Sequence, residues 1–329
     1  MKSHQVTGIG NALVDVIAPV QDAFLAEHGV EKGIMTLIDR PRAAELYGHM
    51  GPATEISGGS GANTIAGLAA LGDRTAYVGK VKDDQLGAIF AHDLRAQGAT
   101  YVTPLAPADH EAETGRCMVM VSPDGERSMN TYLGVSEFLA PSDIDEALMA
   151  GSEWLYLEGY RFDGPESHQA FAKAISACKT AGGRASVTLS DPFCVDRHRD
   201  DFLKMIRTDL DLLFANEHEL MSLYQVSTLS AALDAARADC ALVACTVGAR
   251  GAIILHGQDT IEVPATAARV LDATGAGDLF AAGFFHGLVS GRDLAACGRM
   301  GCIAAGEIIS HYGARPEADL KALFSAAGL

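Results

Sequence analysis

The chain has 329 residues, 48% of them hydrophobic, which is enough for a large buried core and suggests two domains or one domain with an elaboration. Its formal net charge of −17 at pH 7 argues against a nucleic-acid partner, because such binding needs clustered lysine and arginine. The N-terminus lacks the apolar run of a signal peptide, and no uninterrupted apolar segment is long enough to cross a membrane. We therefore expect a cytoplasmic protein with no membrane partner. Its seven cysteines include no Cys-x-x-Cys pair, so reduced thiols are expected.

Short apolar runs typical of buried parallel strands alternate along the chain with amphipathic helical segments. The strands are expected at residues 5–9, 76–81, 154–157, 185–189, 212–215 and 242–246. The helices are expected at residues 85–97, 165–181, 229–237, 278–290, 294–309 and 317–324. This alternation predicts an α/β fold with a doubly wound, mostly parallel sheet flanked by helices.

Two regions interrupt the alternation and have the pattern of antiparallel strands joined by turns. One pairs residues 14–20 with 33–38, and the other combines residues 101–103, 114–121 and 128–132. From the pattern alone, these segments fit hairpins that extend the main sheet.

The most informative segment is Asp-Ala-Thr-Gly-Ala-Gly-Asp at 272–278, which leads directly into an apolar helical run. Gly275, Ala276 and Gly277 carry almost no side chain, so their backbone N–H groups at the positive end of a helix can bind an anion. Asp278 in the same turn can accept the proton of an attacking hydroxyl, which suits phosphoryl transfer. Taken alone, the segment also fits a tight turn with a helix cap. It is not a Walker loop, because Asp278 stands where that loop has lysine.

A second small-residue turn, Gly58–Asn63, also opens a helical segment and carries an amide that can donate and accept hydrogen bonds toward a polyol. Three further segments of interest are residues 8–15, 216–219 and 246–251. With all five motifs in this order, the chain resembles the ribokinase-like (PfkB) carbohydrate kinase family over most of its length. Gly-Asn-Ala-Leu-Val-Asp at 10–15 and Gly-Glu-Arg-Ser at 125–128 look nearest to the adenosine-kinase-like branch.

The resemblance implies an ATP-dependent, Mg²⁺-using kinase that phosphorylates a primary hydroxyl of an adenosine-like nucleoside or a small sugar. A ribose or ketohexose kinase is the alternative, followed by a catalytically silent nucleoside or sugar sensor. The implied α/β kinase core comprises residues 1–13, 41–98 and 133–329, and the implied β-sheet lid comprises 14–40 and 99–132. The lid would close over the acceptor and exclude water, and it allows a homodimer formed through the lid.

The resemblance also implies roles for individual residues. Asp278 would be the general base, with Gly275, Ala276 and Gly277 as the anion hole. Acceptor-binding residues would be Asn11, Asp15, Gly59, Asn63 and Glu158, although a structural role is an equal alternative for Glu158. Nucleotide-binding residues would be Asn216, Glu219, Thr246, Gly248 and Gly251, with Glu219 also ordering magnesium-bound water. Asn216 and Glu219 equally fit a helix capping box.

A monovalent-cation site for K⁺ is a weaker implication of the same resemblance. Its ligands would be Asp272 and Thr274, with carbonyls of a later loop that includes His311 and Gly313. Arg127 resembles a lid arginine that reaches the moving phosphate, and an exposed arginine on a hairpin is the equal alternative.

Overall fold

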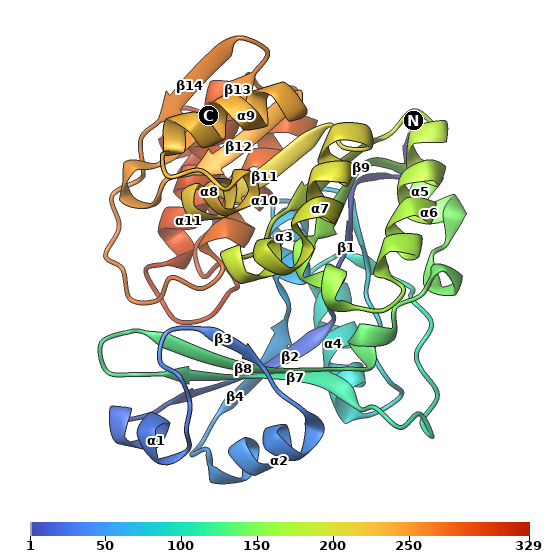
Figure 1. Ribbon diagram of the computed structural model, residues 1–329, viewed down its shortest axis with the longest axis vertical. Helices are drawn as coiled ribbons and strands as arrows, with labels where there is room; N and C mark the ends of the chain where they lie inside the picture. The colour runs from blue at the N-terminus through green and yellow to red at the C-terminus, as the bar shows by residue number, and fades with distance from the viewer. Residues whose placement is uncertain (1) are drawn as a thin grey trace.

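The computed structural model describes residues 2–329, and two β-sheets of unequal size organise them (Figure 1). The strands of the larger sheet are β1 (His4–Ile9), β5 (Thr75–Val78), β6 (Thr100–Tyr101), β9 (Ser152–Glu158), β10 (Arg184–Thr188), β11 (Leu212–Asn216), β12 (Leu242–Thr246), β13 (Ala252–His256) and β14 (Asp259–Val263). Their order is β14-β13-β12-β11-β10-β9-β1-β5-β6. Neighbouring strands from β6 to β12 are parallel, whereas β13 and β14 add an antiparallel edge.

Helices cover both faces of this sheet, which confirms the expected doubly wound α/β class. They are α3 (Ser60–Ala70), α4 (Gln85–Ala96), α5 (Glu146–Ala150), α6 (Ser167–Thr180), α7 (Pro192–Thr208), α8 (Glu217–Tyr224), α9 (Leu229–Asp239), α10 (Ala276–Val289), α11 (Leu294–Ile308) and α12 (Leu320–Ala326). Strand β9 shows why two cores form. Trp154 and Tyr156 point into the core shared with α10 and α11, and Leu155 and Leu157 point into the opposite core, because side chains alternate along a strand.

The smaller sheet lies to one side of the main body and has the strand order β3-β8-β7-β2-β4 (Figure 1). Its strands are β2 (Leu13–Pro19), β3 (Met35–Leu37), β4 (Thr54–Gly58), β7 (Thr114–Val121) and β8 (Arg127–Gly134), and α1 (Asp22–Glu27) and α2 (Arg40–His49) accompany them. Met118 and Met120 of β7 pack with Leu25 and Leu46 in a small core of this sheet's own. The expected hairpin is present, since β7 and β8 are antiparallel on either side of a turn at residues 122–126.

One expected strand pairing is wrong. Strands β2 and β3 do not form a hairpin, because the chain between them, including α1, carries β3 to the opposite edge of the sheet. There β3 pairs in parallel with β8, whereas β2 lies between β4, which is antiparallel, and β7, which is parallel.

Sheet membership also differs from the expected boundaries at two places. Strand β4 belongs to the smaller sheet, although residues 41–98 were expected in the core. Strand β6 pairs with β5 in the larger sheet, although residues 99–132 were expected in the lid. The division into a kinase core and a lid otherwise stays a prediction.

All seven cysteines lie among the described residues, where they are buried and free, as expected for reduced core thiols. Within residues 2–329 there is no helix that is both long enough and apolar enough to span a bilayer. Most of the polar residues that are expected to form the site lie where the two sheets meet.

Candidate active site

A pocket of about 750 Å³ has walls from both sheets. The larger sheet contributes the carboxyl ends of β9, β11 and β12, because parallel strands end at one edge where the following helices begin. The pocket brings together most of the residues expected from the sequence, namely Asn11, Asp15, Gly59, Asn63, Glu158, Asn216, Glu219, Thr246, Gly248, Thr274, Gly275, Ala276, Gly277 and Asp278. Four expected residues are not among its lining, namely Gly251, Asp272, His311 and Gly313.

The small-residue turn forms the N-terminus of α10, a helix of fourteen residues. Gly275 is the N-cap residue and has φ +76°, a left-handed conformation that favours glycine. A Cβ atom there would lie 3.1 Å from the Cβ atom of Ala314, so a larger residue would also crowd the loop after α11. The turn therefore presents the first N–H groups of α10 and their positive dipole to the pocket, as an anion site requires.

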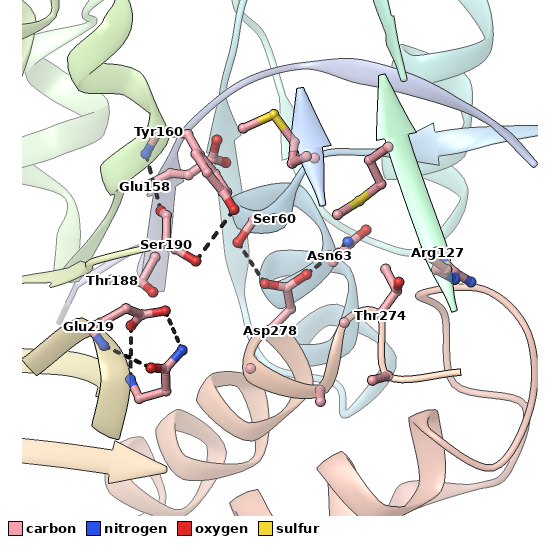
Figure 2. Close-up of a pocket in the computed structure, with 18 of the residues that line it drawn as sticks. Ser60, Asn63, Arg127, Glu158, Tyr160, Thr188, Ser190, Glu219, Thr274 and Asp278 are labelled. Carbon is pink, nitrogen blue, oxygen red and sulfur yellow. Dashed lines mark hydrogen bonds between the residues drawn. The ribbon is translucent and has the colours of Figure 1, made fainter. Parts of the chain in front are cut away.

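Asp278 lies in the first turn of α10, and both of its carboxylate oxygens accept hydrogen bonds (Figure 2). Ser60 Oγ donates to Oδ1 over 2.6 Å, and Asn63 Nδ2 donates to Oδ2 over 2.9 Å. Burial raises the pKa of Asp278 to about 6, while these two bonds and the charge of Arg315 act in the opposite direction. The carboxylate is thus mostly ionised at pH 7 and can accept a proton there.

Asp15 lies on β2 and points at β4, where its carboxylate fills the space beside Gly58. A Cβ atom on Gly58 would come within 2.2 Å of the Asp15 carboxyl carbon, so glycine is required there by this close approach. Burial raises the pKa of Asp15 to about 6, the charges of Arg315 and Arg127 lower it, and the charge of Asp278 raises it. Both carboxylates line the same pocket.

Asn11 follows β1, and two hydrogen-bond donors orient its side-chain amide. Ser136 Oγ donates to Asn11 Oδ1 over 3.0 Å, and Arg161 Nη1 donates to the same atom over 3.1 Å. Arg161 is only 1% exposed and also donates to the carbonyl of Ser136 over 2.7 Å. Because the oxygen of the amide is already bonded, its two N–H donors are left for the pocket. Sequence reasoning missed Arg161, whose partners lie in distant segments.

Glu158 lies at the end of β9, where its carboxylate joins two backbone segments. Its Oε2 accepts from the Gly61 N–H over 2.7 Å, and its Oε1 accepts from the Asn11 N–H over 3.3 Å. Burial raises the pKa of Glu158 to about 7, although these N–H donors lower it. Both oxygens bond to backbone, so this geometry supports the structural alternative for Glu158 more than direct acceptor binding.

The Asn216–Glu219 pair forms a capping box at the start of α8 (Figure 2). Asn216 Oδ1 accepts from the Glu219 N–H over 2.9 Å, and Glu219 Oε2 accepts from the Asn216 N–H over 2.8 Å. Burial raises the pKa of Glu219 to about 7. Thr188 and Ser190 line the same region of the pocket. Both carboxylate oxygens of Glu219 take part in the cap, because Oε1 accepts from Asn216 Nδ2 over 2.6 Å. These residues would therefore hold a magnesium ion only through its bound water.

Asp272, which the resemblance implies as a ligand of a monovalent cation, is bonded to other groups of the protein. The carboxylate of Asp272 is fully buried, forms an ion pair with Arg127, and accepts from the N–H groups of Thr274 and Gly313, each over 3.0 Å. Arg127 is 8% exposed, so the exposed-arginine alternative is wrong. Since N–H donors and a guanidinium already engage this carboxylate, its surroundings do not fit a potassium ion. Within residues 2–329 there is also no cluster of three or more His, Cys, Asp or Glu side chains that could hold a metal.

The fold and its comparison with known proteins define a phosphotransferase that acts on an alcohol group. Residues 34–320 match the model of the pfkB family carbohydrate kinases, and the chain belongs to this family. The resemblance and the fold inferred from the sequence are thereby confirmed.

Two solved structures are similar to this chain over nearly its whole length. A probable sugar kinase from Rhizobium etli is 45% identical and has a TM-score of 0.95, covering 100% of this chain and 99% of its own. The adenosine kinase from Sinorhizobium meliloti is 44% identical with a TM-score of 0.94, covering 99% of each chain. Adenosine kinase 2 from Arabidopsis thaliana is 26% identical over 93% of this chain and 94% of its own length.

Proposed function

We propose that this kinase transfers the γ-phosphate of ATP to the primary hydroxyl of a nucleoside such as adenosine. The two solved relatives divide by name between a sugar kinase and an adenosine kinase, so the choice of acceptor rests on the pocket. The observation that supports a nucleoside is an apolar part of the wall formed by the smaller sheet, which contains Leu13, Met35, Leu37, Met129 and Leu133. The polar side chains of the same wall are Asp15, Glu126, Arg127 and Thr131.

This apolar wall suits a purine better than a bare sugar. A nucleobase presents two flat faces of low polarity, whereas a free ribose or ketohexose carries hydroxyls around its ring. Hydroxyls placed against Met35 and Met129 would lose their hydrogen bonds to water without gaining others. The ribose of a nucleoside would instead lie toward Asp15 and the free N–H donors of Asn11, which can bind its hydroxyls.

The residues around α10 support the proposed chemistry. The N–H groups at the start of α10, such as that of Gly277, would bind the transferring phosphoryl group as its charge develops. Asp278 would accept the proton of the attacking hydroxyl, and its bonds with Ser60 and Asn63 hold the carboxylate in place for this step. Magnesium held through water by Asn216 and Glu219 would neutralise phosphate charge when bound.

The smaller sheet is the proposed lid. It supplies the apolar wall over the acceptor while the larger sheet supplies Asp278 and the anion site, so approach of the two sheets would exclude water from the reacting atoms. Excluding water matters because water is the competing nucleophile. A homodimer through this sheet stays a prediction of the resemblance, and a cytoplasmic location stays a prediction from the sequence.

The test measures ADP release with Mg²⁺-ATP and a panel of adenosine, inosine, ribose and fructose. Burying about 150 Å² of base is worth roughly 4 kcal/mol, so kcat/KM for the best nucleoside should exceed that for ribose by at least ~100-fold. In Leu133→Asn the value for the nucleoside should fall while the value for ribose is unchanged. A higher kcat/KM for ribose or fructose than for every nucleoside would show that the acceptor is a sugar.

A further inference from the structure

Arg315 lies in the segment after α11 and bonds to residues of β4 and α3, which are distant in the sequence. Its Nη2 donates to the carbonyl of Ser57 over 2.8 Å and to Ser57 Oγ over 3.1 Å, at the end of β4. Its Nη1 donates to Asn63 Oδ1 on α3. Arg315 does not line the pocket, so it stands behind the wall that carries the reacting groups.

Through Asn63, Arg315 controls which atom faces Asp278. Because Arg315 bonds to Asn63 Oδ1, the Nδ2 group is turned toward Asp278 and donates to its carboxylate over 2.9 Å. The opposite amide orientation would place an oxygen against the carboxylate and a nitrogen against the guanidinium, and both contacts would be repulsive. Asn63 is 4% exposed, so water cannot easily replace either bond.

The charge of Arg315 acts on the same group. Asp278 shares one pocket with the carboxylates of Asp15 on β2 and Glu158 on β9, and the charge of Arg315 lowers the pKa of Asp278. Arg315 also opposes the charge of Asp15, a task that it shares with Arg127. Carboxylates in one buried pocket repel, and a nearby guanidinium offsets this repulsion.

We propose that Arg315 is a positioning residue for phosphoryl transfer. It orients the Asn63 amide toward Asp278, and it places a guanidinium charge behind the pocket that Asp15 and Asp278 share. It does not line that pocket, so it acts through Asn63 and through its charge. The inference rests on the proposed role of Asp278 as general base.

The experiment compares Arg315→Met and Arg315→Lys with wild type, using the best acceptor of the panel. Met removes both the hydrogen bonds and the charge, whereas Lys keeps a charge without the paired donors of the guanidinium. In Arg315→Met we expect kcat to fall at least ~10-fold and the acid limb of the kcat–pH profile to move to higher pH by at least half a unit. Arg315→Lys should return the limb toward wild type and recover only part of kcat.

Arg299→Met is the matched control, because Arg299 donates to the carbonyl of Ala327 on the surface, away from the pocket. It should keep wild-type kcat and the wild-type limb. Melting curves and ATP binding are measured for each variant, and if Arg315→Met does not fold, the kcat of Arg315→Lys decides. An unshifted acid limb in folded Arg315→Met, or a kcat equal to wild type in either variant, would overturn the proposal.

Asp278→Asn is assayed in parallel to keep the two proposals apart. If Asp278→Asn is inactive and Arg315→Met behaves as wild type, the inference about Arg315 fails while the role of Asp278 stands. If Asp278→Asn retains turnover, Asp278 is not the base, whatever Arg315 does.

Discussion

Arg127 on β8 of the smaller sheet is ion-paired with Asp272, two residues before the turn at 274–277 that opens α10. The pair joins a strand of the proposed lid to the loop that forms the anion site. The guanidinium lies where the resemblance implied a monovalent cation. Its presence determines the effect on turnover that we expect from added potassium.

We expect turnover in KCl and in choline chloride of equal ionic strength to agree within about twofold, because Arg127 already neutralises Asp272. Initial rates at saturating acceptor and Mg²⁺-ATP measure this directly. Activation of tenfold or more by K⁺ over choline would instead support the cation site implied by the resemblance.

Replacing Asp278 by Asn should lower kcat by at least ~10²-fold, since an amide cannot accept the proton of the attacking hydroxyl. ATP affinity should be retained, because the N–H groups of α10 are unchanged. Single-turnover rates and ATP titrations check both parts. Near-normal turnover would show that another group serves as base.

The rate should decline as the pH falls through about 6. A base whose pKa is raised from 3.8 to about 6 is protonated below that pH and then cannot accept a proton. We expect kcat to be nearly flat above pH 7 and to fall about tenfold per unit well below pH 6. Because the pKa of Glu219 is also raised, Glu219→Gln is the control, and the limb should persist in that variant.

Stability should fall as the pH rises from about 4 to about 7. Asp15, Glu158, Glu219 and Asp278 all have a raised pKa in the folded state, so in this window the native protein binds more protons than the unfolded chain. The free energy of unfolding then decreases with pH, and the penalty is complete above the folded-state pKa values. Melting of the ligand-free protein should occur at higher temperature at pH 5 than at pH 8.

In the same assay, Asp278→Asn should narrow the difference in unfolding free energy between pH 5 and pH 8 by about 1 kcal/mol, because it removes one of the buried charges. Urea unfolding at both pH values measures the change. A difference as large as that of wild type would mean that Asp278 does not titrate in this range.

Asp15→Ala should weaken use of the acceptor by more than ~100-fold and leave ATP affinity unchanged. Two charge-assisted bonds to ribose hydroxyls, each worth roughly 1.5–3 kcal/mol, would be lost. Wild type should correspondingly discriminate against 2′- and 3′-deoxynucleosides in kcat/KM. Equal use of the deoxy forms by wild type, or a loss of ATP affinity in the variant, would make Asp15 structural.

What could be predicted from the sequence was local chemistry. Gly275 and Gly277 predict a turn that opens a helix, and Asn216 with Glu219 predicts a helix cap. Both features can be predicted because each depends on residues only a few positions apart. The alternating apolar runs likewise gave the parallel strands of the larger sheet.

The contacts that sequence reasoning missed join distant segments. Arg315 binds Asn63, 252 positions earlier, and Arg161 binds Asn11, 150 positions earlier. Neither arginine belongs to a periodic or capping pattern, so only the folded chain brings its partners together. The pairing of β3 with β8 was missed for the same reason, since it depends on the path of the intervening chain and not on a local turn.

Asn11 and Asp15 are four residues apart, yet they belong to different parts of the molecule. Asn11 is anchored by Arg161 and Ser136 next to the larger sheet, whereas Asp15 lies within the smaller one. A nucleoside bonded to both would therefore act as a non-covalent cross-link between the sheets. Its binding energy would restrain motion of β7 and β8, so slower amide hydrogen exchange in that hairpin would report occupancy even without turnover.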